Sequence, residues 1–192
     1  MPLKQCLAAI DEVNAQDPKQ EMDEKGQMQA ACLLYGQRMS QVLNNFQPEA
    51  NEVLQIAVRA QHIQRWHIPR SDYPMDRPGY LRWRRELGAH HAELCGKIMS
   101  DFDYNDADVE KAKSILRKQK LKQDPDTQTL EDVACLVFLQ YYFADFAKSH
   151  SEEKIISIVQ KTWRKMSDNA QQTALGLSLG EQELGLIQKA LA

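Results

Sequence analysis

The segment from Arg59 to Glu86 concentrates side chains that could bind an anion. It holds seven arginines and no lysine: Arg59, Arg65, Arg70, Arg77, Arg82, Arg84 and Arg85. Histidines, tryptophans and tyrosines lie among them: His62, His67, Trp66, Trp83, Tyr73 and Tyr80. A guanidinium group presents paired N–H donors that match the oxygens of phosphate or carboxylate. The segment therefore predicts an anion-binding site, and the candidate substrate-binding residues are Arg59, Arg65, Arg70, Tyr73, Arg77, Tyr80 and Arg84.

A second set of side chains has the chemistry of a metal site. The candidate metal ligands are His62, His91 and Asp132, and the candidate catalytic carboxylates are Glu131 and Glu93. Imidazole nitrogen and carboxylate oxygen together suit Mn, Fe, Zn or Mg. Either glutamate, or His90, could complete the ligand set.

Structural interpretations of the same residues stay open. Glu131 and Asp132 fall in the first turn of a predicted helix, where acidic residues favour the helix macrodipole. The arginines could stack on tryptophan rings or pair with nearby acids and so only fix the loop. The basic run Lys111–Lys122 is either a solvated helix face or a phosphate clamp.

Hydrophobic periodicity predicts an all-α protein, and no alternating strand pattern stands out. About eight helices are expected in a single compact domain that spans residues 1–192. The predicted helices are Leu3–Asn14, Gln27–Phe46, Pro48–Trp66, Gly79–Asp101, Asp106–Lys120, Thr129–Lys148, Ser151–Met166 and Gly180–Leu191. Polar or proline-rich loops are expected at 16–25 and 67–78, and a less regular stretch at 169–179.

Composition limits the classes of partner and the cellular compartment that we expect for this protein. The net charge is only −3, so affinity for an anion must come from local clustering, and nucleic acid is a weaker candidate than a small phosphorylated ligand. No apolar run approaches the roughly 18 residues of a membrane span. The four cysteines lie far apart without a CxxC pair, which predicts buried thiols in a cytoplasmic protein. Composition leaves the oligomeric state open.

The order of the histidines and acids resembles the HD-domain superfamily of metal-dependent phosphohydrolases. Those proteins are all-α and carry a histidine, a His-Asp pair and an aspartate on successive helices. The resemblance assigns the first histidine to His62, the paired histidine to His91 and the final aspartate to Asp132. The signature pair itself is absent, because Ala92 follows His91.

Longer strings resemble one uncharacterised family that is known only as a domain of unknown function. They are RAQHIQRWHIPR, YPMDRPGYLRWRREL, HAEL, DPDTQTLEDVACLVFLQYYFADF and KTWRKMS, and they cover nearly the whole chain. This resemblance implies a grouping but no established activity.

Three functions are compatible with these residues. The first is a metal-dependent phosphohydrolase that acts on a nucleotide or another small phosphorylated metabolite. In such an enzyme, a divalent metal would activate water while arginines hold the phosphate oxygens. The second is a non-catalytic module that binds an anion, a nucleotide or RNA through the Arg-rich segment 59–86. The third is a structural protein whose arginines are paired internally.

Overall fold

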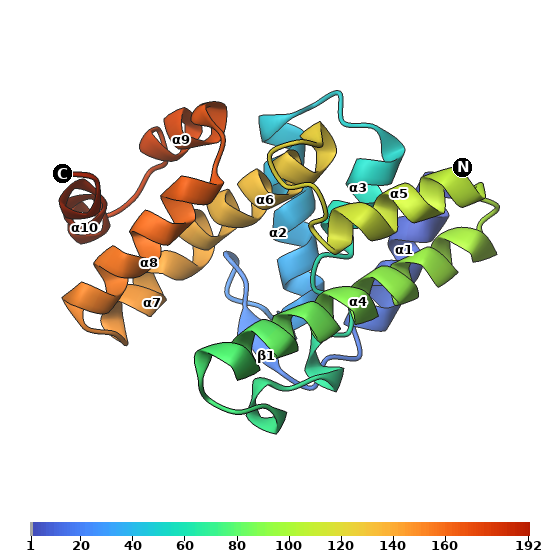
Figure 1. The fold of residues 1–192 in the computed structure, drawn as a ribbon, viewed down its shortest axis with the longest axis horizontal. Coiled ribbons are helices and arrows are strands. Elements are labelled where there is room, and N and C mark those ends of the chain that lie inside the picture. Colours follow the sequence, from blue (N-terminus) through green and yellow to red (C-terminus); the bar gives the residue numbers. More distant parts are fainter. Residues whose placement is uncertain (1) are drawn as a thin grey trace. The chain divides into compact units, whose positions relative to one another are not determined.

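The structure is a computed structural model that describes residues 2–192. This part of the chain contains ten α-helices and one short two-stranded sheet (Figure 1). The helices and strands are α1 (Pro2–Asn14), β1 (Gln20–Met22), β2 (Met28–Ala30), α2 (Ala31–Phe46), α3 (Glu52–Arg59), α4 (Arg77–Asp101), α5 (Asp106–Leu116), α6 (Pro125–Val137), α7 (Phe143–Lys148), α8 (Glu152–Lys165), α9 (Asp168–Leu175) and α10 (Glu181–Leu191). The predicted all-α class is confirmed, with ten helices where about eight were expected.

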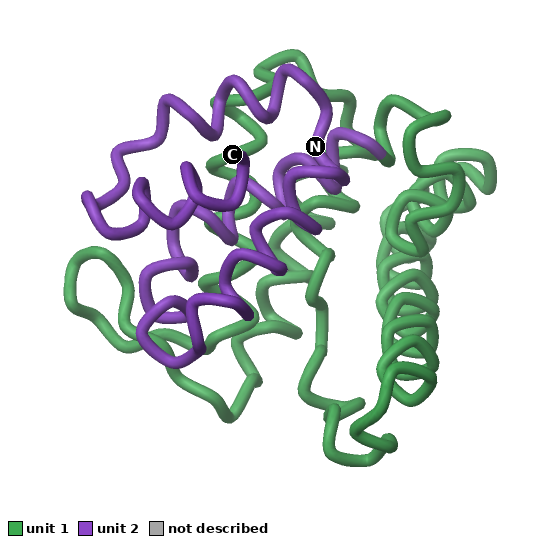
Figure 2. Tube along the Cα trace, turned by 60° about the vertical axis from the view of Figure 1, so that its left-hand side comes forward, with its two compact units in different colours: residues 1–127 green, residues 128–192 purple. Residues whose placement is uncertain are grey.

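The chain divides into two compact units, residues 1–127 and 128–192 (Figure 2). In the first unit, α3 lies at the centre of the core and packs against α1, α2 and α5. Its residues Leu54, Ile56, Ala57 and Val58 are fully buried. Helices α4 and α5 run side by side in opposite directions (Figure 1). The first unit therefore packs three helices around one short apolar helix.

The second unit is built around α8, which packs against α7 and α10. Ile155 and Val159 form the buried stripe of α8, and Ser151 caps its first turn by accepting a hydrogen bond from Lys154. A π-helical turn at Phe138–Tyr142 joins α6 to α7. The sequence predicted one continuous helix here, because its apolar pattern does not reveal a one-residue change in the hydrogen-bond ladder.

Several element boundaries differ from the sequence-based predictions. Residues 20–30 form an antiparallel hairpin in which Met22 pairs with Met28; a loop and the start of a helix were expected here. The predicted helix Pro48–Trp66 begins at Glu52, since Asn51 caps it by accepting from the amide of Leu54. It ends at Arg59, and Gln64 has left-handed backbone geometry with φ of 53°.

Two further boundaries bear on the candidate site. Helix α5 ends at Leu116, and Lys118 follows in the left-handed region with φ of 55°. Its amide bonds to Ile115 and that of Gln119 to Ser114, the hydrogen-bond pair of a Schellman motif. Helix α6 begins at Pro125, so Glu131 and Asp132 lie beyond its first turn and the macrodipole interpretation was wrong.

No helix within residues 2–192 has both the length and the apolar character needed to cross a membrane.

Candidate anion-binding site

The start of α4 is fixed tightly against the loop that precedes it. Asp76 caps the helix by accepting a hydrogen bond of 2.7 Å from the amide of Gly79. Pro78 occupies the first turn, where a missing N–H costs nothing. A Cβ on Gly79 would lie 2.2 Å from the carbonyl oxygen of Pro74, so only glycine allows this approach. This contact sets the direction in which α4 leaves the loop.

The loop before α4 is held by its own side chains. The indole N–H of Trp83 donates to the carbonyl of Ile68 at 2.9 Å. The guanidinium of Arg70 donates to the carbonyls of Tyr73 and Pro74 at 3.0 and 2.7 Å. These bonds satisfy backbone oxygens that the irregular loop would otherwise leave open. They also engage Arg70, a predicted substrate-binding residue, in fixing the loop.

His62, Arg65 and His91, here called the His–Arg cluster, lie together inside the first unit. The ring of His62 stacks on Tyr35 with centroids 3.9 Å apart. A terminal guanidinium nitrogen of Arg65 lies 3.3 Å from Nε2 of His62. The ring of His91 lies 6.1 Å from that of His62. The guanidinium of Arg65 also sits over the ring of Trp83 at 4.9 Å, a cation–π contact.

The polar atoms of this cluster are only partly satisfied. Within residues 2–192, Arg65 forms no ion pair with a carboxylate. His91 is 4% exposed, and its buried Nε2 has no hydrogen-bond partner in the described chain. Native proteins pair nearly all such buried groups, so unpaired ones point to a missing partner. The neighbouring His90 also has a buried Nε2 without a partner among the described residues.

The electrostatic potential at the cluster is positive. The pKa of His62 lies well below its ordinary value, first because of burial and then because of the positive charges of Arg65, Lys118 and Arg84, and of His91 when that ring is protonated. Burial, Arg65, His90 and Lys118 lower the pKa of His91 to about 3, and a hydrogen bond to the backbone of Gln61 opposes them. Both imidazoles are therefore neutral near pH 7. A negative charge bound here would be stabilised.

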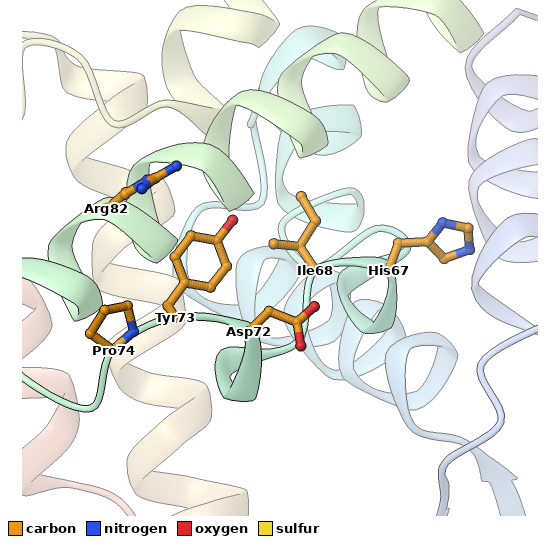
Figure 3. Close-up of a pocket in the computed structure, with 6 residues that line it drawn as sticks. All are labelled: His67, Ile68, Asp72, Tyr73, Pro74 and Arg82. Carbon is orange, nitrogen blue, oxygen red and sulfur yellow. The ribbon is translucent and has the colours of Figure 1, made fainter.

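A pocket of about 310 Å³ lies at the loop before α4 (Figure 3). Its lining residues are His67, Ile68, Asp72, Tyr73, Pro74 and Arg82. Two of these residues share one partner, because Glu86 accepts from the Tyr73 hydroxyl at 2.5 Å and from Arg82 at 2.7 Å. The ring of His67 stacks on His90 at 6.3 Å. Within residues 2–192, the buried side-chain nitrogens without a partner are those of Asn14, His90 and His91, and of these only His91 belongs to the cluster and none lines the pocket.

The remaining predicted substrate-binding residues have separate positions. Arg59 donates to both carboxylate oxygens of Asp11, at 2.6 and 2.5 Å, and so joins α3 to α1. Arg77 is exposed in the first turn of α4. Tyr80 and Arg84 are exposed one turn apart, and Arg84 donates to the Tyr80 hydroxyl at 3.1 Å. Of the predicted set, Arg65 lies in the cluster, and Arg84 acts on it through its charge.

The carboxylates predicted for metal binding and catalysis have other partners. Asp132 accepts from the amide and the hydroxyl of Ser167 at 2.8 and 2.6 Å, at the start of α9. Glu131 lies 3.4 Å from the amine of Lys165. Glu93 pairs with Arg117 and with Lys113 on α5. Within residues 2–192, no three histidine, cysteine or acidic side chains are arranged so that they could hold a metal ion.

One neighbour of the cluster, Tyr35, was not identified from the sequence, whereas stacking of an arginine on a tryptophan and a phosphate clamp in the basic run of Lys118 were both among the open interpretations. Tyr35 supplies a stacking surface, Trp83 lies under Arg65, and Lys118 adds positive charge. Lys118 belongs to the basic run 111–122, in which Lys111 and Lys113 lie in α5 while Lys118, Lys120 and Lys122 have left-handed backbone geometry. Left-handed geometry is unusual for lysine, and no local sequence signal marks it.

Comparison with known proteins places the chain in one family. Residues 4–187 match a family described as a domain of unknown function, DUF4202. No curated protein and no solved structure matches the chain, so the HD-domain resemblance remains a prediction. Because the match spans almost the whole sequence, the chain belongs to the DUF4202 family.

Proposed function

We propose that this protein binds a small anion, carrying a phosphate or carboxylate group, at the His–Arg cluster. The observation that carries the proposal is Arg65. Its guanidinium is partly buried and lies against neutral His62, without a carboxylate partner in residues 2–192. Arg59 and Arg82 pair with the carboxylates of Asp11 and Glu86. Among the arginines of the segment that have no such pair within residues 2–192, Arg65 is the one that lies against His62, so an anion bound there would neutralise its charge.

Electrostatics support this assignment. Burial is the main cause that lowers the pKa of Arg65, and the charge of Arg84 contributes in the same direction. Taking a cation out of water costs free energy unless an opposite charge compensates it. A bound oxyanion would supply that charge and would accept hydrogen bonds from the guanidinium. Tyr35 stacks on His62, and Trp83 lies under the guanidinium of Arg65. These two contacts hold both side chains in place before the ligand arrives.

Metal-dependent phosphohydrolysis is less well supported by the donor set. The nearest group to Nε2 of His62 is a guanidinium, which would repel a metal ion at that nitrogen. Both oxygens of Asp132 already accept hydrogen bonds from Ser167. These residues do not fit a divalent metal, so we assign no catalytic step through one. Hydrolysis stays a prediction from the sequence.

The proposal is tested by isothermal titration of the purified protein with inorganic phosphate. Wild type is compared with Arg65→Gln, and Arg85→Gln is the matched control, since Arg85 is an exposed arginine on α4. We expect Arg65→Gln to weaken binding about tenfold to a hundredfold, the usual size of a lost charge-assisted hydrogen bond. Arg85→Gln should bind as wild type does.

Two controls separate this outcome from a metal-mediated one. The titration is repeated after treatment with a chelator and after addition of Mn or Zn. Unchanged affinity in all three samples supports direct binding by the protein. Equal affinity in wild type and Arg65→Gln would refute the assignment, and affinity that appears only with metal would favour the hydrolase.

A further inference from the structure

We propose that the start of α4, together with the loop residue before its cap, is a contact surface for an anionic lipid membrane. The surface, here called the Arg–Leu face, consists of Met75, Arg77, Leu81, Arg84 and Arg85, all of which are exposed. The proposal goes beyond anion binding at the His–Arg cluster and is carried by residues outside that cluster.

Two large apolar side chains are exposed on this face. Met75 is 82% exposed and Leu81 is 56% exposed. Met75 directly precedes the N-cap residue Asp76, and an apolar side chain at that position often packs onto the first turns of the helix. Here Met75 remains in solvent. Single exposed apolar residues are common, but two of them beside several arginines form a surface that gains free energy on leaving water.

Three arginines surround Leu81 on the surface of α4. Arg77 lies four residues before Leu81, while Arg84 and Arg85 lie three and four residues after it, so all three are its neighbours on one helix face. Within residues 2–192, none of the three pairs with a carboxylate, whereas the neighbouring Arg82 has such a pair. The face therefore presents an apolar side chain among positive charges that no acid in the described chain neutralises.

The position of these charges does not favour the helix itself. The N-terminal end of a helix carries a partial positive charge, which disfavours cations in the first turns. The first turn of α4 contains Arg77 and no acidic residue. Helix stability therefore does not account for the arginines, whereas a negatively charged surface outside the protein does.

An anionic membrane complements the Arg–Leu face in both respects. Lipid phosphates accept hydrogen bonds from guanidinium groups, and the boundary of the acyl region accepts apolar side chains. The start of α4 and the loop before it lie at the edge of the first unit, where a flat surface can reach them (Figure 1). The net charge of −3 does not prevent this contact, because salt screens exposed charges that lie more than about 8–10 Å apart.

The test is co-sedimentation of the intact protein with lipid vesicles. One sample contains phosphatidylcholine alone, and the other contains equal parts of phosphatidylcholine and phosphatidylserine. We expect at least about tenfold tighter binding to the anionic vesicles. On those vesicles, Arg85→Gln should weaken binding about fivefold and Leu81→Gln about tenfold. Met28→Gln is the matched control, because Met28 is 58% exposed in β2, outside the face, and this variant should bind as wild type does.

The outcomes separate this inference from the proposed function. Arg65→Gln should sediment with anionic vesicles as wild type does. Loss of vesicle binding in Arg65→Gln but not in Leu81→Gln would place the lipid phosphate at the His–Arg cluster and overturn the inference. No sedimentation with anionic vesicles, or equal sedimentation of wild type and folded Leu81→Gln, would overturn it while leaving phosphate binding at the cluster in place.

An acidic protein segment is the other class of partner that such a face could contact, and polyglutamate is the probe for it. Wild type that binds polyglutamate but not anionic vesicles, with the binding lost in Leu81→Gln, would assign the Arg–Leu face to an acidic protein and overturn the membrane assignment. Circular dichroism of each variant confirms that it is folded before its binding is compared.

Discussion

At the scale of single residues, the molecule keeps two histidines neutral in a positive field. His62 and His91 lie near cations from three places, which are Arg65 in the 3₁₀ turn Arg65–His67, Arg84 on α4 and Lys118 after α5. Burial is the largest cause for both, and the charges act in the same direction. An imidazole held neutral in the folded state titrates at its ordinary pKa once the chain unfolds.

This linkage gives stability a defined pH dependence. The folded-state pKa of His91 is about 3, against 6.5 for the free group, so below pH 6.5 the unfolded chain binds a proton that the folded chain does not. We expect the free energy of unfolding to fall as pH decreases from 6.5 towards 3. One such group contributes about 1.4 kcal/mol for each pH unit. Urea unfolding at pH 7.5, 6.0 and 5.0 measures the effect.

His91→Asn provides the comparison for this experiment. The variant lacks the titrating group, so its stability should decline less steeply between pH 6.5 and 5.0. Phosphate should also reduce the decline in wild type, because an anion favours the protonated imidazole. Parallel pH profiles for wild type and variant would show that His91 is not held neutral by the fold.

Single residues also show which parts of the candidate site could be predicted from composition and which could not. The Arg-rich segment predicted an anion site, and in the structure Arg65 contacts His62, whose ring lies 6.1 Å from that of His91. Composition could not separate Arg65 from Arg59, because the partner of Arg59 is Asp11, which lies 48 residues away in the chain. Which cation lacks a carboxylate depends on tertiary contacts, and no local pattern records them.

At the scale of elements, the cluster depends on how α4 leaves the preceding loop. Trp83 supports Arg65 from α4, and its indole bonds back to Ile68 in the loop. Gly79 permits the close approach that makes this geometry available. A substitution at the start of α4 should therefore alter ligand binding at the cluster, although Gly79 itself contacts no ligand-facing group.

Gly79→Ala and Gly88→Ala test this dependence as a matched pair on α4. A Cβ at position 79 would overlap a backbone carbonyl at 2.2 Å, so we expect a loss of about 1–3 kcal/mol in unfolding free energy and weaker phosphate binding. A Cβ at position 88 would meet its nearest atom at 3.8 Å, so we expect a gain of about 1 kcal/mol from helix propensity. Chemical denaturation and phosphate titration of both variants measure these effects. Similar behaviour of the two variants would contradict the role given to Gly79.

Element existence was largely predictable, whereas element boundaries were not. Periodic apolar residues revealed helices such as α2 and α8, whose buried faces recur at helical spacing. The end of α3 at Arg59 was missed because residues 60–66 continue the apolar pattern while the backbone turns at Gln64. The hairpin at 20–30 was missed because its strands are only three residues long.

At the scale of the whole molecule, the proposed site belongs to the first compact unit. His62, Arg65 and His91 all lie within residues 1–127, as do Trp83 and Lys118. Asp132 and Glu131 belong to the second unit, where Ser167 and Lys165 are their partners. The sequence-based prediction placed Asp132 and Glu131 in one metal site with His62 and His91, because their order along the helices resembles that of the HD-domain superfamily. Helix order alone does not specify which side chains meet.

The most direct test of the central claim follows the imidazole signals of the intact protein by NMR while phosphate is added. The account predicts saturable shifts of the His62 and His91 signals, little change at His150, which contacts Phe146 in the second unit, and loss of the shifts in Arg65→Gln. Saturating phosphate that leaves both signals unmoved, or that moves them equally in Arg65→Gln, would contradict an anion site at the His–Arg cluster.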